Sequence, residues 1–487
     1  ISLNDLGKLD ECVTSYNKAI TIKPDYAEAH SNLGIALQAL GKIKEAVTSY
    51  NKAISIKPDY AEAHSNLIFS LLYSPSTSGD DILQEALKWD QQHGNNSEVS
   101  QYNNTPDPER RLRIGYVSAD FRNHAVRYVL EPLLAEHNRE EVEIFCYAEI
   151  ARPDHVTKRF EGYADHWRST IGLSDKKLAD TIRTDMIDII VDCTGHTGNN
   201  RLIALTYKPA PIQVNYFMMH GTTSGVKAMD YVLSDPISTP PGSENQFSEE
   251  VVILPRTTFS FYPDPDWPEV DTSPPTGDEP LFACVGDPRR IGPATITLWA
   301  KLLDLVPRSR ILFKHLGYRN PKMKEYWRLK FKELGDRIIF EGVDGGWGNH
   351  MDVYARVNVV LDTLPMSGGT SSIIPLWMGV PVITMAGAYY VHRTGTAIVT
   401  NAGVPEFSAE NPEDYLKIAS DLVSDREHQA LLRRTLRDTI KTSHIMDARG
   451  CTADIEMAYR KMWRKWCKNA EISDGVGSVS NGRGSTG

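Results

Sequence analysis

Short apolar runs bounded by glycine, proline and polar residues recur from about residue 111 to residue 385. Runs of roughly four to eight residues rich in β-branched side chains are typical of buried strands in a parallel sheet. Segments with helical apolar spacing lie between most of them. Strands that alternate with helices predict an α/β architecture with parallel sheets. The predicted strands cover 112–117, 141–149, 187–191, 212–216 and 231–233, then 280–285, 310–315, 337–341, 357–361 and 382–385.

Helix signals fill several of the gaps between these strands and continue beyond the last one. Pro293 stands at a first helical turn, and Gly379 and Pro381 end another helix. The final helix is amphipathic, and we expect its apolar face to pack on the body of the protein. The predicted helices cover 80–92, 126–137, 176–184, 293–303, 352–357, 372–378, 414–424, 426–442 and 451–467.

The N-terminal part repeats itself. The segment SYNKAITIKPDYAEAHSNL at Ser15–Leu33 recurs almost unchanged at Ser49–Leu67, 34 residues later. This is the period of tetratricopeptide helix pairs, which stack into a solenoid with a concave surface for extended peptides. The repeats therefore predict either a groove for a protein partner or a spacer.

Polar and proline-rich stretches divide the chain. We predict repeats and a closing helix at 1–92, a linker at 93–110, a first sheet domain at 111–260, a linker at 261–279, a second sheet domain at 280–468 and a disordered tail at 469–487. Asp264-Pro265-Asp266 matches the Asp-x-Asp pattern that binds a metal–nucleotide complex in some glycosyltransferases. Its proline-rich surroundings favour a plain linker.

The segment Val357–Gly387 combines a strand, a glycine loop and a short helix. The loop is Ser367-Gly368-Gly369-Thr370-Ser371. The first N–H groups of a helix lack internal partners and favour anions, and glycine lets a phosphate approach the backbone. The segment therefore predicts an anion site, with an ordinary βα turn as the alternative.

Two histidines follow strands of the first domain, His124 after 112–117 and His196 after 187–191. Ligands of parallel sheets bind beyond the carboxyl ends of the strands. Both histidines are therefore candidates for a site, although a lone loop histidine is commonly just solvated.

Composition excludes several classes of protein. The 487 residues carry a net charge of −10 with mixed signs, which argues against a nucleic acid or an anionic membrane as main partner. Six widely spaced cysteines favour free thiols over disulfides or a zinc site. No membrane-spanning run or signal peptide is visible, so we expect a cytoplasmic protein. The chain begins inside a repeat, and we expect further repeats before Ile1.

Several motifs together resemble the family of O-linked N-acetylglucosaminyltransferase and SPINDLY, over nearly the whole chain to about Cys467. They are RIGYVSADFRNH at Arg113–His124, DMIDIIVDCTGHTGNNRL at Asp185–Leu202, KPAPIQV at Lys208–Val214, AMDYVLSD at Ala228–Asp235, NHMDVY at Asn349–Tyr354, and VLDTLPMSGGTS with LWMGVPVITMAG within Val360–Gly387. The resemblance implies tetratricopeptide repeats followed by a GT-B glycosyltransferase fold of two Rossmann-like domains.

The same resemblance implies roles for individual residues. It places His350 against the nucleotide base, and Thr370 and Ser371, in the loop with Gly368 and Gly369, on the diphosphate. It places His124 and Asp185 where the family has groups proposed for proton transfer, and Arg290 where the family has a diphosphate-contacting lysine. We add His196 to the candidate binding residues.

The chain also departs from the family pattern. Arg290 replaces lysine, and its planar fork is not equivalent to an ammonium. Gly369-Thr370-Ser371 replaces His-Thr-Thr, so an imidazole beside the phosphate is missing. Ile374 replaces an acid that holds the ribose, and Met218-Met219-His220-Gly221-Thr222 replaces Gly-Tyr-Pro-Gly-Thr.

The resemblance implies an inverting glycosyltransferase that uses no metal or other cofactor and moves a sugar from a nucleotide to serine or threonine of proteins. The donor is expected to be UDP-N-acetylglucosamine, with GDP-fucose as the alternative. Two rival hypotheses are a degenerate catalytic unit that serves as a repeat scaffold, and an enzyme acting on a small acceptor. Expected partners are acceptor proteins, reached through the repeat groove, and further copies of the chain, reached through the missing repeats.

Overall fold

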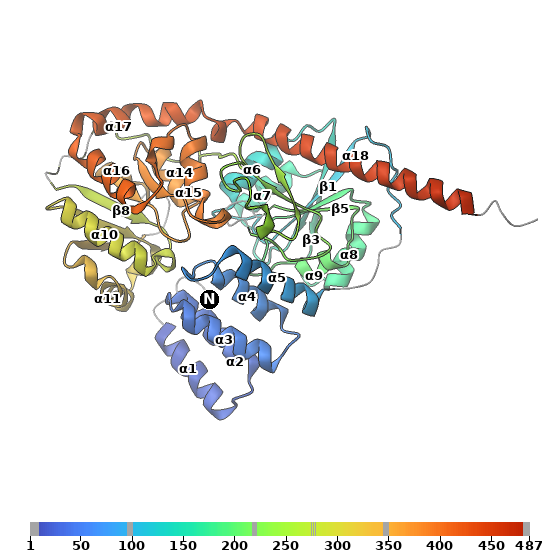
Figure 1. The fold of residues 1–487 in the computed structure, drawn as a ribbon, viewed down its shortest axis with the longest axis horizontal. Helices are drawn as coiled ribbons and strands as arrows, with labels where there is room; N and C mark the ends of the chain where they lie inside the picture. The colour runs from blue at the N-terminus through green and yellow to red at the C-terminus, as the bar shows by residue number, and fades with distance from the viewer. Residues whose placement is uncertain are drawn as a thin grey trace, which may run out of the picture.

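The computed structural model describes residues 9–94, 101–216, 222–273, 275, 277, 279–343 and 350–480, without the side chains of 471–480. A helical array precedes two parallel sheets, each with its own helices (Figure 1). The predicted architecture of repeats followed by two Rossmann-like domains is confirmed.

The helical array consists of two antiparallel helix pairs and a closing helix. The pairs form because small residues let the helices approach closely: Ala36, Ala46 and Ala53 are completely buried, and Gly34 faces the ring of Tyr50. The closing helix begins with a capping box in which Ser78 accepts the N–H of Asp81. The helices are α1 (Leu9–Ile22), α2 (Ala27–Ala39), α3 (Ile43–Ile56), α4 (Ala61–Leu71) and α5 (Gly79–His93).

The first sheet has seven parallel strands in the order β3-β2-β1-β4-β5-β6-β7. Its centre is apolar, and Ile114 on β1 pairs with Ile144 on one side and Ile189 on the other. The strands are β1 (Leu112–Ser118), β2 (Val142–Ala148), β3 (His166–Ser169), β4 (Ile189–Asp192), β5 (Ile212–Asn215), β6 (Tyr231–Ser234) and β7 (Glu250–Ile253). The helices between them are α6 (Arg127–Glu136), α7 (His155–Tyr163), α8 (Asp175–Thr184) and α9 (Leu202–Thr206).

The second sheet has six parallel strands in the order β10-β9-β8-β11-β12-β13. They are β8 (Leu281–Val285), β9 (Arg310–Lys314), β10 (Ile338–Glu341), β11 (Val359–Leu361), β12 (Val382–Met385) and β13 (Ser408–Ala409). The helices are α10 (Pro293–Leu305), α11 (Pro321–Lys330), α13 (Val353–Arg356), α14 (Thr370–Trp377), α15 (Thr394–Asn401), α16 (Pro412–Ser424) and α17 (Arg426–Lys441).

The last helix, α18 (Ala448–Ser480), runs from the second domain across the first and packs on α6 (Figure 1). Glu456 accepts a hydrogen bond at 2.8 Å from the ring of His137, and Trp463 donates to the carbonyl of Asp107. Sequence order groups this helix with the predicted domain at 280–468, but its apolar face is buried on the first domain. It also continues to Ser480, into the stretch predicted to be disordered.

The linker between the sheets is packed rather than free. Phe261 and Trp267 are buried, and Asp264 forms an ion pair with the buried Arg127. The Asp264-Pro265-Asp266 pattern is therefore held against the first domain, as a linker would be. The six cysteines form no disulfide, in agreement with the predicted free thiols.

The order of the strands in each sheet indicates where the candidate site lies. In each sheet the order reverses beside the first strand, between β1 and β4 in one and between β8 and β11 in the other. A crevice opens beyond the carboxyl ends of the strands at such a point. The loops after β1, β4, β8 and β11 are therefore the places where ligand-binding residues are expected. Among the described residues, no helix is long and apolar enough to cross a membrane.

Candidate functional site

A cavity of about 440 Å³ lies between the two domains and the end of the repeat array. The loops after β1, β4, β8 and β11 all contribute to its lining, so both switch points open into one space. The first domain supplies Asp120, Arg122, His124 and Thr197–Asn199. The second supplies Asp287, Arg289, Arg290 and Gly369–Ser371, and the repeat array supplies Phe69 and Tyr73.

The glycine loop is held in place by a buried carboxylate. Asp362, directly after β11, accepts hydrogen bonds from the N–H of Gly368 at 2.7 Å and from the hydroxyl of Thr384 at 2.8 Å. Burial raises the pKa of Asp362, and these bonds and the nearby Arg290 work against that shift. A Cβ on Gly368 would stand only 2.5 Å from the hydroxyl oxygens of Ser371 and Ser372, so any larger residue would force these side chains to move.

Helix α14 begins at Thr370, with Gly369 as its N-cap residue. The carbonyl of Gly369 accepts the N–H groups of Ser372 and Ile373, which starts the helical pattern. The N–H groups before these have no acceptor within a helix and carry the positive end of the helix dipole. Because Gly369, Thr370 and Ser371 line the cavity, this end of the helix faces it.

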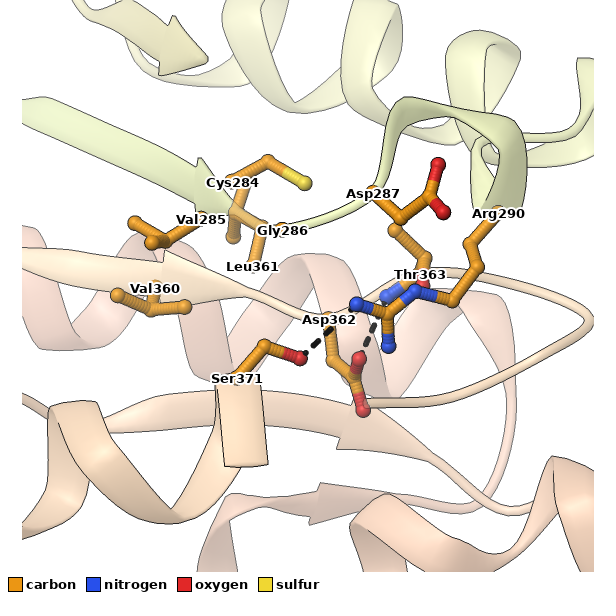
Figure 2. Close-up of a pocket in the computed structure, with 10 residues that line it drawn as sticks. All are labelled: Cys284, Val285, Gly286, Asp287, Arg290, Val360, Leu361, Asp362, Thr363 and Ser371. Atoms are coloured by element: carbon orange, nitrogen blue, oxygen red, sulfur yellow. Dashed lines mark hydrogen bonds between the residues drawn. The ribbon is translucent and has the colours of Figure 1, made fainter. Parts of the chain in front are cut away.

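Arg290 reaches across to the same loop from the end of β8 (Figure 2). Its guanidinium donates to the carbonyl of Ser367 at 3.3 Å and to the hydroxyl of Ser371 at 3.2 Å. Gly286 makes this path possible, because it has φ of +153° and a Cβ there would stand 2.6 Å from the guanidinium. The structure thus brings Arg290 to the N-terminus of α14, the loop with which the family resemblance groups it, and its role toward a diphosphate stays a prediction.

Arg290 ends a short 3₁₀ helix, η3 (Pro288–Arg290), that Asp287 caps. One oxygen of Asp287 accepts the backbone N–H of Arg289 at 2.9 Å, and the other accepts the side-chain Nε of Arg289 at 2.7 Å. Burial alone would raise the pKa of Asp287, but the Arg289 guanidinium holds that pKa well below its usual range. The loop therefore presents two arginines side by side and one compensating carboxylate.

His124 faces this cationic loop from the first domain. Its ring lines the cavity, and its Nδ1 lies 3.5 Å from the carboxylate of Asp120. Burial lowers the pKa of His124, and Asp120 works against that shift. An imidazole that is neutral at pH 7 can accept a proton. The cavity thus combines a proton acceptor on one side with cations and helix N–H groups on the other.

His350 lies just before α13, close to the end of β9. Its ring contacts Tyr354 edge-on at 6.3 Å between centroids. Burial and then the positive charge of Lys314 lower the pKa of His350 to about 4, so the ring is neutral at pH 7. It is not among the residues that line the cavity described above, and its role against a base stays a prediction.

The structure does not bring His196 or Asp185 to the cavity. His196 is 2% exposed; its Nε2 donates to the carbonyl of Ser224 at 2.8 Å and its Nδ1 pairs with the hydroxyl of Ser65 at 3.1 Å. The repeat array covers His196. The next residues of the same loop, Thr197–Asn199, are not covered in this way and line the cavity. Asp185 caps the end of α8 and pairs with Arg168 at 3.0 Å.

Sequence analysis missed the two aromatic residues that the repeat array contributes. Phe69 and Tyr73 stand where the preceding repeat has Ile35 and Ala39. The close match between the repeats ends at Leu67, and the appearance of aromatic residues just beyond it is the signal that could have found them. Of the departures from the family motifs, Ile374 is buried in the core, and Met218–Gly221 lie outside the described residues.

No group of three or more histidine, cysteine or acidic side chains in the described part of the chain is arranged to hold a metal ion. The ligands that the cavity offers are instead arginines, hydroxyls and backbone N–H groups, which bind phosphate oxygens.

Comparison with known proteins agrees with this architecture. The model of glycosyl transferase family 41 matches residues 92–262 and 281–455, and a TPR repeat model matches residues 2–41 and 39–67. A mutant of the O-GlcNAc transferase of Thermobaculum terrenum has a solved structure with a TM-score of 0.88 to this chain. It is 35% identical, and the match covers 95% of this chain and 89% of that one.

Two plant proteins, each named a probable UDP-N-acetylglucosamine–peptide N-acetylglucosaminyltransferase SPINDLY, are also similar. The one from Arabidopsis thaliana is 31% identical over 76% of this chain and 41% of its own length. The one from Petunia hybrida is 32% identical over 76% of this chain and 40% of its own length. The chain therefore spans about two fifths of these relatives. Because the family model matches both sheet domains over most of their length, the chain belongs to glycosyl transferase family 41.

Proposed function

We propose that the chain is an inverting protein O-glycosyltransferase that transfers N-acetylglucosamine from UDP to serine or threonine hydroxyls. The observation that carries this proposal is the meeting of Arg290 and the N-terminus of α14 opposite His124, in one cavity at both switch points. The printed names of the relatives, which are UDP-N-acetylglucosamine–peptide N-acetylglucosaminyltransferases, support the choice of donor and acceptor.

The leaving diphosphate is stabilised by the second domain. Negative charge grows on the diphosphate as the glycosidic bond breaks. Arg290 and the first N–H groups of α14 are already oriented by Ser367, Ser371 and Asp362, so they need little rearrangement to meet that charge. A preorganised donor of this kind typically contributes about 3–4 kcal/mol to the transition state. In this proposal no metal is needed to neutralise the leaving group.

The acceptor hydroxyl loses its proton to the first domain. His124 is the candidate acceptor because it lines the cavity and burial lowers the pKa of its ring, which favours the neutral form. Asp185, the other group implied by the family resemblance, is paired with Arg168 outside the cavity-lining residues. His350 would lie against the nucleotide base, and the repeat groove would hold the acceptor protein.

Two alternatives follow from specific residues. Ile374 is buried and apolar where the family has a ribose-holding acid, and Gly369 lacks an imidazole. These changes favour either a different donor, GDP-fucose, or a binding scaffold without transfer.

A panel of donors tests the proposal. Thermal unfolding should be followed with UDP, GDP, UDP-N-acetylglucosamine and GDP-fucose, and peptide products should be weighed by mass spectrometry. A ligand at 100 times its Kd adds about 2.7 kcal/mol of stability. We expect stabilisation by UDP and its sugar, with a peptide mass increase of one N-acetylhexosamine. Stabilisation by GDP alone would support the fucose alternative, and binding without any product would support the scaffold.

A further inference from the structure

The last repeat ends in an aromatic pair that belongs to the cavity. Phe69 lies on α4 and Tyr73 in the turn that follows it, and their rings meet edge-to-face at 5.6 Å. Both rings line the cavity, and Tyr73 is only 6% exposed. An aromatic side chain in this position has a face to offer to a cation.

That cation is Arg289. Its guanidinium carbon lies 5.5 Å from the centre of the Tyr73 ring, while its Nε and backbone N–H bond to Asp287. The carboxylate thus holds one edge of the side chain, and the ring covers its face. Arg289 and Arg290 are consecutive in the three residues of η3, so the position of one limits the position of the other.

The repeat array is anchored to the second domain at three further points, which fix Tyr73 relative to η3. The hydroxyl of Tyr389 donates to the carbonyl of Thr77 at 3.3 Å. The hydroxyl of Tyr326 donates to the carbonyl of Leu40 at 2.6 Å, and Lys330 donates to the carbonyl of Gly41 at 3.0 Å.

We propose that Tyr73 is a positioning residue of the donor site: it holds Arg289 and Asp287 in place, and through them the cationic loop that receives the diphosphate. The repeat array then forms one wall of the catalytic site in addition to any role in binding acceptor proteins. This inference rests on the proposed function, because it assumes that the loop binds a nucleoside diphosphate.

Calorimetry with UDP and GDP on the full chain tests the inference. Replacing Tyr73 with leucine removes the ring face and should weaken binding about twofold to thirtyfold, the range expected for a cation–π contact of about 0.5–2 kcal/mol. Tyr73→Phe keeps the face and should bind as the wild type does. A matched control is Tyr60→Leu, because Tyr60 covers Lys57 at 4.9 Å in the same repeat but does not line the cavity.

A double-mutant cycle distinguishes positioning from general destabilisation. In an Arg289→Gln background, Tyr73→Leu should no longer weaken binding, because the cation that it positions is gone. Should Tyr73→Leu fail to fold, Asp287→Asn tests the same arrangement from the opposite edge of Arg289 and should weaken binding by a similar factor. Equal losses from Tyr73→Leu with and without Arg289, or unchanged affinity, would overturn the inference. If the wild type binds neither UDP nor GDP, the proposed function itself fails.

Discussion

Arg290 shows how one substitution changes the chemistry of a site while preserving its charge. Its two terminal nitrogens contact the carbonyl of Ser367 and the hydroxyl of Ser371, so the fork spans the loop before α14. A lysine at this position would place a point charge with no second arm. Because Gly369 carries no imidazole, the second hydrogen bond of the Arg290 guanidinium is the contact that can compensate for the missing ring.

The position of His350 leads to a prediction about a single residue. If the neutral imidazole stacks on the nucleotide base, His350→Ala should weaken nucleotide binding by about 1–3 kcal/mol, the scale of one base–aromatic stack. His350→Phe should keep most of the affinity. Calorimetry with UDP measures the difference, and the exposed His428 on α17 provides a control histidine in the same domain. An alanine variant with wild-type affinity would remove His350 from the site.

From the sequence, a residue can be placed in the candidate site only when it directly follows a predicted strand. His124, Arg290 and the glycine loop follow strands at the switch points and do reach the cavity. His196 follows a strand at the same edge, yet its ring turns toward Ser65, which is 131 residues away in sequence. No local pattern reveals such a contact, and the same is true of Tyr73 beside Arg289.

At the scale of elements, the apolar pattern predicts the central strands well. Strands β1, β2, β4, β8 and β9 are mostly buried, and apolar residues form the greater part of each one. The pattern missed β3, β7 and β13, which lie at sheet edges, are only two to four residues long and in two cases are largely exposed or half-buried. An edge strand packs on fewer neighbours, so its sequence needs fewer apolar residues.

Two glycines within helices should respond to alanine in opposite ways. A Cβ on Gly34 of α2 would stand 2.6 Å from the ring of Tyr50, whereas a Cβ on Gly162 of α7 would meet nothing within 4 Å. Alanine gains about 0.5–1 kcal/mol in a helix interior, but overpacking costs about 1–3 kcal/mol. Gly34→Ala should therefore lower the thermal unfolding midpoint, and Gly162→Ala should raise it. An unfolding midpoint that is higher for Gly34→Ala than for Gly162→Ala would show that the contact between α2 and α3 can relax.

At the scale of the whole molecule, the repeat array is joined to both sheet domains. Ser65 and Trp89 contact His196 of the first domain, while Leu40, Gly41 and Thr77 contact the second. Figure 1 shows the array lying against both domains on the same side of the molecule. The sequence indicates the separate domains but not how they pack against one another. Their packing places residues of the repeat array in the lining of the cavity between the domains.

The junction at His196 should make stability depend on pH. Burial lowers the pKa of His196 from its usual 6.5 to about 4. Below pH 6.5 the unfolded chain therefore binds a proton that the folded chain does not, and stability falls as the pH drops toward 4. Between pH 7.5 and pH 5 this group alone should remove about 2 kcal/mol.

Denaturant unfolding at the two pH values measures this loss. His196→Gln should be less stable at pH 7.5 but should lose less stability on acidification than the wild type does. The exposed His155 supplies the control, His155→Gln, which should show the wild-type change. An unchanged pH dependence in His196→Gln would mean that the junction does not hold this histidine neutral.

Sugar transfer by the wild type and by Arg290→Ala tests the central claim most directly. Labelled UDP-N-acetylglucosamine and GDP-fucose would be offered with a peptide library, and the exposed Arg434→Ala on α17 would serve as control. Because the contact strengthens as the bond breaks, Arg290→Ala should lower turnover about a hundredfold or more while changing donor binding less. Arg290→Lys should keep appreciable activity only if a point charge suffices. Transfer by Arg290→Ala at the wild-type rate, or no transfer by a wild type that binds nucleotide tightly, would contradict the account.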